Sequence, residues 1–319
     1  MEYRDGETVL EGILCYDDAI SERKKRPGVL VCHTFWGVEA YCERRAKQLA
    51  ELGYLAFVFD VFGRWTQTDD PALAGDRMRA TFADMPSLRR RAAAVLGVLA
   101  EHSRVNADRL AVIGYCFGGT VALELARSAL PHTENLRAVV AFHAARLAVT
   151  GTPEEISALS RNVKGSVLVC HGAADPHVVP GELDTLIEQF ESAGTDYVFV
   201  AYAAALHAFT DPGSDARNLP AAKCNPNADR RSWDHVKALF AEKMPTELAN
   251  PNRSRPNADP PLPQHRDLRC VETTGVPPDE PAEVERPPSR TSPTGITATG
   301  LLSERWLQCR MPDEPAASV

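Results

Sequence analysis

Short apolar runs alternate with segments of helical periodicity through most of the chain. The apolar runs have the composition of strands buried on both faces of a sheet, and they lie at 28–33, 55–60, 110–114, 136–142, 166–170 and 197–202. The helical patterns lie at 43–52, 73–102, 117–127, 182–193 and 233–242, with Pro86 predicting a break or kink in the second. This alternation predicts an α/β fold with a mostly parallel central sheet and helices on both faces. The segment 8–15 has no following helix and is expected to form an antiparallel edge.

The pattern changes near Met244. More than half of the 24 prolines lie beyond it, and that part of the chain holds one aromatic residue, Trp306. Such a segment cannot bury enough apolar surface to offset the entropy lost on ordering. We therefore predict an ordered domain over 1–247 and a proline-rich, disordered C-terminal tail over 248–319. A docking role for the tail is the less favoured alternative.

Composition narrows the class of protein. The chain of 319 residues has 35 Lys and Arg against 43 Asp and Glu, a net charge of −8, which argues against a nucleic-acid partner. No stretch reaches the ~18–20 apolar residues of a membrane helix, so no membrane association is expected. The eight cysteines are scattered, and Cys32, Cys116 and Cys170 lie in or beside apolar runs, as reduced core cysteines do. We expect a cytoplasmic protein in a reducing compartment.

Candidate chemistry begins at Gly114-Tyr-Cys-Phe-Gly-Gly, which follows an expected strand and opens an expected helix. This is the context of a nucleophile elbow, Gly-x-Nuc-x-Gly, with Cys116 as the nucleophile. The turn is tight, so a side chain at Gly114 or Gly118 would collide with neighbouring backbone. The helix amino terminus favours a thiolate at Cys116. The alternative is a structural cysteine in a glycine-rich turn.

An acid and a histidine follow later in the chain, each beyond an expected strand. Asp175 lies in the loop after 166–170, and His207 lies a few residues after 197–202. The order nucleophile, acid, histidine is that of the elbow-type hydrolases, so we predict a triad of Cys116, Asp175 and His207. His207 would accept the thiol proton, and Asp175 would orient the ring. Backbone amides of Phe35 and Phe117 would form the oxyanion hole.

A metal site is the less favoured reading of two other segments. Cys-His pairs recur at 32–33 and 170–171, at the ends of two expected strands. Adjacent strand residues point to opposite faces, so one pair cannot present both side chains to one ion. We expect no metal.

The chain resembles the dienelactone hydrolase family of α/β-hydrolases over most of residues 1–245. The resemblance rests on YRDGETVLEG (3–12), HTFWGV (33–38), GYCFGG (114–119), HGAADP (171–176) and LHAFT (206–210). It implies an α/β-hydrolase fold, cysteine-dependent hydrolysis of esters or lactones, a cytosolic location and no cofactor. Cys116, Asp175 and His207 match the triad of the family.

The chain departs from the family at Thr34, where members commonly have a glutamate that takes part in activating the cysteine. Threonine cannot accept a proton at neutral pH. We hypothesise that Cys116 relies more directly on His207, or that activity is weaker than is typical of the family. Glu39 is near in sequence, without any indication that it points inward.

Members that act on dienelactone also hold the substrate carboxylate with arginines. Asp211 stands close to the position of one such arginine here, and Arg77 and Arg79 are candidates for a single replacement. A small neutral or aromatic ester is therefore an equal expectation. The residues assigned to contact substrate are Thr34, Trp36, Tyr115, Phe209, Arg77 and Arg79, with the aromatic ones equally compatible with a place in the core.

The function predicted from the sequence is a carboxylic ester hydrolase, similar to a carboxymethylenebutenolidase, that acts on a small-molecule ester or lactone as a monomer or small homo-oligomer. A broad small-ester carboxylesterase without dienelactone turnover is one alternative. A hydrolase-fold binding protein without catalysis is the other.

Overall fold

The computed structural model describes residues 2–21, 23–64, 66–248 and 268–271. The strands are β1 (Glu2–Asp5), β2 (Thr8–Asp17), β3 (Arg26–Cys32), β4 (Leu55–Phe59), β5 (Val105–Tyr115), β6 (Leu136–Phe142), β7 (Ser166–Gly172), β8 (Tyr197–Tyr202) and β9 (Leu268–Val271). The helices are α1 (Ala40–Glu51), α2 (Pro71–Ala83), α3 (Met85–Glu101), α4 (Phe117–Arg127), the 3-10 turn η1 (Thr133–Asn135), α5 (Pro153–Arg161), α6 (Glu182–Ala193) and α7 (Pro226–Lys243).

The sheet runs in the order β1-β2-β4-β3-β5-β6-β7-β8. The pairs from β4 to β8 are parallel, and β2 is antiparallel to both β1 and β4. The predicted parallel sheet and its antiparallel edge are confirmed. Parallel strands align their carboxyl ends, so the loops after β5, β6, β7 and β8 meet at one edge, where ligand sites of such sheets lie.

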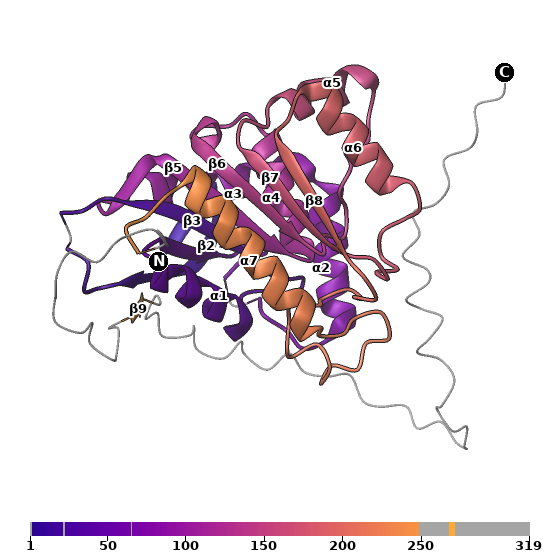
Figure 1. Cartoon of the computed structure of the whole chain (residues 1–319), viewed down its shortest axis with the longest axis horizontal. Coiled ribbons are helices and arrows are strands. Elements are labelled where there is room, and N and C mark those ends of the chain that lie inside the picture. The colour runs from indigo at the N-terminus through magenta and orange to yellow at the C-terminus, as the bar shows by residue number, and fades with distance from the viewer. Residues whose placement is uncertain (1, 22, 65, 249–267, 272–319) are drawn as a thin grey trace. The chain divides into compact units, whose positions relative to one another are not determined.

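Helices cover both faces of the sheet (Figure 1). One apolar cluster packs α1 and α7 on the sheet, with Leu49 and Phe240 fully buried between the layers. The other packs α2, α3, α4 and α6 on the opposite face, with Leu96 and Val121 fully buried. Covered on both sides, the central strands are as apolar as the sequence suggested. No helix in the described part of the chain is both long and apolar enough to cross a membrane.

The long helical segment near Pro86 is two helices. Asp84 ends α2 and begins α3, where its side chain accepts a hydrogen bond from the Ser87 amide. Pro86 then occupies the first turn of α3, where the missing amide hydrogen costs nothing. The sequence did not predict α5, although Thr152 and Glu155 form a capping box at its start.

The predicted tail needs a correction at residues 268–271. These residues form β9, antiparallel to β2, and Cys270 forms a disulfide with Cys15. The edge of β2 offers unpaired backbone groups that a short apolar segment can bond, although the surrounding sequence is rich in proline. The expectation of reduced cysteines is thus wrong for this pair, whereas Cys32, Cys116 and Cys170 are free thiols. The rest of the tail, 249–267 and 272–319, lies outside the described residues, and the domain boundary stays a prediction.

Candidate active site

Cys116 lies on a sharp turn between β5 and α4. Its φ of 55° and ψ of −117° put a non-glycine residue in a sparsely populated region, a kind of strain that gathers at functional sites. The two glycines are required by close backbone contacts. A Cβ at Gly114 would lie 1.8 Å from the carbonyl oxygen of Gly118, and one at Gly118 would lie 2.4 Å from that of His33. The turn therefore has the geometry of the predicted elbow.

The structure brings Cys116, Asp175 and His207 together. His207 Nδ1 donates a hydrogen bond to Asp175 Oδ2 at 2.7 Å, and the interaction of the His207 ring with Cys116 raises the pKa of the imidazole. All three residues are buried, with exposed fractions of 6–7%. Asp175 follows β7 and His207 follows β8, so the three residues reach one edge of the sheet from separate strands. A histidine between a thiol and a carboxylate is the arrangement needed for proton transfer to and from sulfur.

Burial, charges and hydrogen bonds shift the pKa values of both His207 and Asp175. Burial lowers the pKa of His207, but the thiolate charge of Cys116 and the hydrogen bond to Asp175 outweigh it and raise the pKa to about 10. Burial likewise opposes the charged form of Asp175, yet hydrogen bonds from His177 and His207 hold its pKa well below the usual value. The arrangement thus favours an imidazolium at His207 beside a carboxylate at Asp175.

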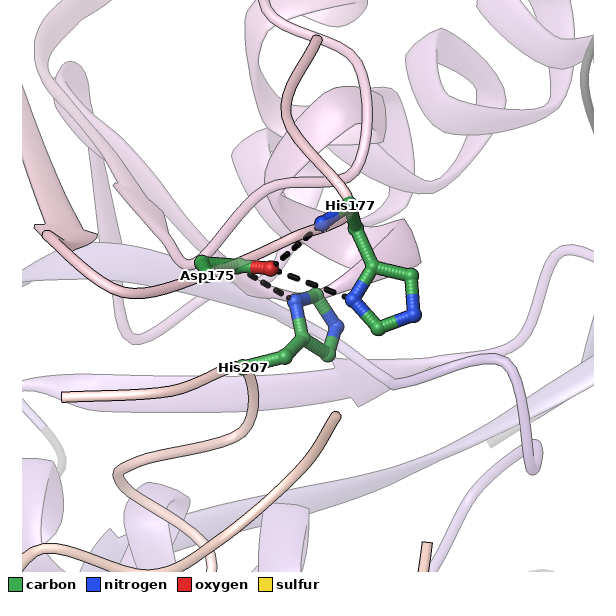
Figure 2. Close-up of side chains that lie close together, drawn as sticks. All are labelled: Asp175, His177 and His207. Atoms are coloured by element: carbon green, nitrogen blue, oxygen red, sulfur yellow. Dashed lines mark hydrogen bonds and ion pairs between the residues drawn. The ribbon is translucent and has the colours of Figure 1, made fainter. Parts of the chain in front are cut away.

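His177 is a further residue of the site that the sequence analysis missed. Its ring Nδ1 and its backbone amide donate to Asp175 Oδ1 at 3.1 and 2.9 Å, so two imidazoles meet at one carboxylate (Figure 2). The sequence could have indicated this role, because His177 follows Asp175 by two residues in the loop at the end of β7.

Asp175, His177 and His207 also have a donor set that a metal ion could use. One ligand atom from each lies within 4.8 Å of the others. The Nδ1 atoms of both rings are occupied by hydrogen bonds to the carboxylate. The Cys-His pairs considered from the sequence are separate, because Cys32 and Cys170 belong to apolar clusters on opposite faces of the sheet.

Thr34 is joined to Glu39, which points inward. Thr34 Oγ1 donates to Glu39 Oε2 at 3.0 Å, and the carboxylate of Glu39 is paired with Arg217. Burial raises the pKa of Glu39, and the charge of Arg217 opposes that shift. The guanidinium of Arg217 also pairs with Asp211 at 3.0 Å and lies 4.7 Å from the ring centroid of Trp36. An acid is thus present beside Thr34, supplied from the start of α1.

The residues assigned to substrate contact have different surroundings. Tyr115 and Phe209 are fully buried in the core on the α1 and α7 side, in keeping with the alternative that the aromatic residues belong to the core, and their contact with substrate stays a prediction. Arg79 pairs with Asp76 along the exposed face of α2, and its contact with substrate also stays a prediction. Arg77 donates to the carbonyl oxygen of Thr66, and its role stays a prediction, as do those of Thr34 and Trp36.

The predicted oxyanion donors come from two segments, the elbow itself and the turn after β3. Phe117 is the first residue of α4, where backbone amides have no partner within the helix. Phe35 lies in the tight turn after β3, where the Gly37 amide donates to the Thr34 carbonyl oxygen at 3.2 Å. Their role in binding an oxyanion stays a prediction.

The family profile of the Dienelactone hydrolase family matches residues 17–244. The solved structure named m3DLH is 38% identical, with a TM-score of 0.70, and the match covers 76% of this chain and 97% of that one. The crystal structure of the dienelactone hydrolase-like promiscuous phosphotriesterase P91, from metagenomic libraries, is 33% identical, with a TM-score of 0.70, and the match covers 76% and 96%.

A curated relative matches a shorter range. The uncharacterized protein K02A2.1 of Caenorhabditis elegans is 34% identical over 158 residues, which is 48% of this chain and 95% of that protein. Cys116, Asp175 and His207 all lie within the range matched by the family profile.

Proposed function

Because the chain belongs to the dienelactone hydrolase family, we propose that it hydrolyses carboxylic esters or lactones through an acyl-thiol intermediate on Cys116. Family membership makes the chain a hydrolase with an α/β-hydrolase fold and a small-molecule substrate. The observation that supports the cysteine mechanism is the buried His207, which Asp175 holds by a hydrogen bond and whose pKa is raised by the charge of Cys116.

Each residue has one task in the proposed reaction. His207 holds the thiol proton, and the Cys116 thiolate attacks the carbonyl carbon of the ester. The tetrahedral intermediate collapses to an acyl-thiol as His207 donates the proton to the departing alkoxide, which leaves as an alcohol, or stays attached when the substrate is a lactone. His207 then takes a proton from water, which attacks the acyl carbon. The thiolate leaves and the carboxylate product is released.

Two groups would assist these steps. Asp175 keeps His207 in the tautomer that presents Nε2 to the thiol and stabilises the imidazolium. The amides of Phe35 and Phe117 would bind the negative oxygen, and losing one such donor typically costs about 3 kcal/mol of transition-state stabilisation.

A neutral ester is the substrate class that the charges around Trp36 support. Arg217 lies over that ring, but it already pairs with Glu39 and Asp211. A third carboxylate, from the substrate, would have to compete with both. We therefore favour a small neutral or aromatic ester over an anionic dienelactone.

Two other functions follow from the same fold. A broad small-ester carboxylesterase would turn over simple esters without dienelactone. A non-catalytic binding protein would bind an ester without turnover. The name of P91 adds phosphotriesters to the compounds worth testing.

A substrate panel tests the proposal. It contains p-nitrophenyl acetate, a dienelactone and a neutral phosphotriester, each assayed with wild type, Cys116→Ser and Cys116→Ala. We expect turnover of the acetate, loss of turnover in Cys116→Ala, and protection of the wild-type thiol from iodoacetamide by substrate. Cys224→Ala is the matched control, because Cys224 is a free and partly exposed thiol. Full activity in Cys116→Ala would refute the mechanism, and binding without turnover would favour the binding protein.

Three properties stay predictions from the sequence. The protein is expected to be cytoplasmic, to be a monomer or small homo-oligomer, and to need no cofactor. The disulfide between Cys15 and Cys270 bears on the first of these, because disulfides persist in oxidising compartments.

A further inference from the structure

His143 is a buried histidine that directly follows β6, at the same edge of the sheet as the elbow. Its side chain is 1% exposed, and its backbone has φ of 36°, which is unusual for a residue other than glycine. The ring Nδ1 lies 3.1 Å from the backbone nitrogen of Cys116, and Nε2 lies 2.8 Å from Thr210 Oγ1. The backbone of His143 is strained, and two hydrogen bonds hold its ring from opposite sides. The surrounding structure therefore fixes the position of this residue.

The hydrogen bonds fix the tautomer of the ring. A backbone N–H can only donate, so Nδ1 of His143 must accept from Cys116, and this amide is shared with the carbonyl oxygen of Phe142 at 3.0 Å. The ring hydrogen is then on Nε2 and is donated to the hydroxyl of Thr210. A protonated His143 could not accept from Cys116.

Thr210 connects this ring to the loop that carries His207. It lies three residues after His207, is fully buried, and its hydroxyl also hydrogen-bonds Tyr41 Oη at 2.5 Å. Arg45 Nη2 donates to the Thr210 carbonyl oxygen at 3.0 Å. Tyr41 and Arg45 both come from α1, so Thr210 is held on its side-chain and backbone atoms by one helix. A continuous hydrogen-bonded path therefore runs from the Cys116 backbone to a rigidly held residue of the His207 loop.

The surroundings keep His143 neutral. Burial and the positive charge of His207 hold the pKa of His143 well below its usual value, while Asp175 acts against that shift and Arg45 adds to it. The rings of His143 and His207 lie 5.2 Å apart, edge to face. His207 can thus carry a positive charge beside a second imidazole that does not compete for the proton.

We propose that His143 is a positioning residue that locks the nucleophile elbow to the His207 loop through Thr210. The inference rests on the proposed cysteine mechanism and assigns no bond-breaking step to His143. Cys116 and His207 come from strands separated by β6 and β7, so their spacing depends on contacts across the sheet edge. The path through His143 and Thr210 is such a contact.

Two substitutions break the path at different points. Thr210→Val removes the hydroxyl and keeps the branched shape. His143→Asn tolerates the positive φ and offers an oxygen to the Cys116 amide, but is too short to reach Thr210. We expect each variant to slow alkylation of Cys116 by iodoacetamide about tenfold at neutral pH, as the loss of one buried hydrogen bond can, and to move the rate–pH profile to higher pH. The double variant should lose no more than the larger single loss.

Tyr54→Phe is the matched control, because Tyr54 is a buried tyrosine whose hydroxyl donates to the Met244 carbonyl oxygen at 3.1 Å, far along the chain from the triad. It should lose stability to urea without a change in alkylation. Tyr41→Phe provides a milder break if Thr210→Val does not fold.

The outcomes separate the inference from the proposed function. Variants with wild-type alkylation profiles, or losses that add in the double variant, would overturn the role of His143 even if esters are hydrolysed. A wild type without turnover would overturn the proposed function, and the alkylation measurements, which need no substrate, would still decide the role of His143.

Discussion

The rings of His177 and His207 lie 4.5 Å apart and donate hydrogen bonds to different oxygens of the Asp175 carboxylate. His207 is buried, whereas the side chain of His177 is 37% exposed. One imidazole therefore faces the nucleophile while the other lies at the surface of the site. The carboxylate is held from both sides, which limits the positions that His207 can adopt.

We expect His177→Ala to reduce kcat/KM only about two- to fivefold, because Asp175 keeps its bonds from His207 and from the backbone amide of residue 177. Asp175→Asn should cost about 10⁴-fold, since an amide can hold the His207 ring in the wrong tautomer. Steady-state kinetics of both variants on the best ester of the panel make the comparison. Equal losses in the two variants would mean that His177 itself takes part in proton transfer.

Thr34→Glu restores the acid that the family commonly has at this position. If its absence limits Cys116, the variant should raise turnover by about tenfold and change the pH dependence of alkylation. The new carboxylate would lie beside Glu39, so one of the two acids should hold a proton at neutral pH. Thr34→Gln matches its size without the charge. Unchanged turnover and thiol reactivity in Thr34→Glu would show that Cys116 does not need an acid at position 34. That result would be consistent with Glu39 serving in its place.

The pH dependence of stability should reveal the charge on His207. Its pKa is raised from an ordinary value of 6.5 to about 10, so its contribution to folding is complete below about 6.5 and is lost as the pH rises through about 10. Cys116→Ala removes the largest of the interactions that raise this pKa. The Tm difference between wild type and Cys116→Ala should therefore be largest near pH 6 and shrink as the pH rises toward 10. A difference that grows with pH would contradict the assignment.

The sequence predicted correctly those features that depend on residues close together in the chain. The buried parallel strands have an apolar composition of their own, and the elbow needs small residues at Gly114 and Gly118 whatever the rest of the chain does. The order of Cys116, Asp175 and His207 along the chain was enough to bring them to one sheet edge, because parallel strands end together.

The remaining features depend on which segments become neighbours. Thr210 meets His143 only because β6 and the loop after β8 end at the same edge, and Glu39 meets Thr34 through the start of α1. Tyr115 precedes the nucleophile directly and therefore points away from it into the core, which the alternation along β5 could have indicated. β9 pairs with β2, which is far away in sequence, and the proline-rich sequence on both sides of β9 gave no indication of a strand.

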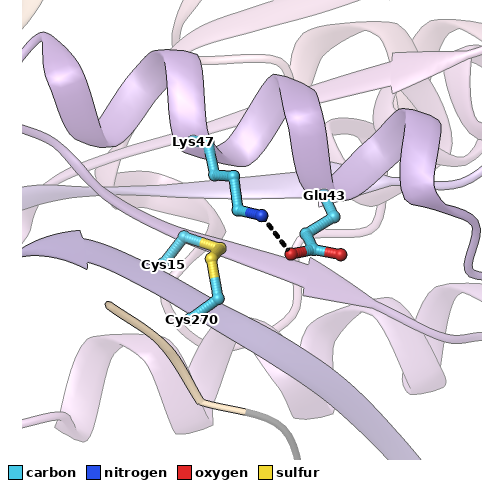
Figure 3. The surroundings of a disulfide bond; sticks show 4 residues. All are labelled: Cys15, Glu43, Lys47 and Cys270. Atoms are coloured by element: carbon cyan, nitrogen blue, oxygen red, sulfur yellow. Dashed lines mark ion pairs between the residues drawn. A yellow bond between two sulfur atoms is a disulfide. The ribbon is translucent and has the colours of Figure 1, made fainter. Parts of the chain in front are cut away.

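Breaking the disulfide of β9 should affect stability without affecting turnover. Cys15 and Cys270 are separated by 255 residues and join β2 to β9 beside the Glu43–Lys47 pair of α1 (Figure 3). A cross-link over so long a loop restricts the unfolded chain strongly, so we expect Cys270→Ser to lower the free energy of unfolding by about 2–4 kcal/mol. In the sheet order β4 and β3 separate β2 from β5, which carries Cys116, so kcat should stay within about twofold.

Urea unfolding of wild type, Cys270→Ser and a chain ending after Glu247 measures this contribution, with Cys224→Ser as the control for losing a free thiol. Treatment of wild type with dithiothreitol should reproduce the loss seen in Cys270→Ser, and the shortened chain should show at least the same loss because it lacks β9 altogether. Equal stability of wild type and Cys270→Ser would mean that the cross-link does not form in solution. A parallel fall in kcat would instead connect the β2 edge to the site, since loss of the strand would then reach Cys116 through β4 and β3.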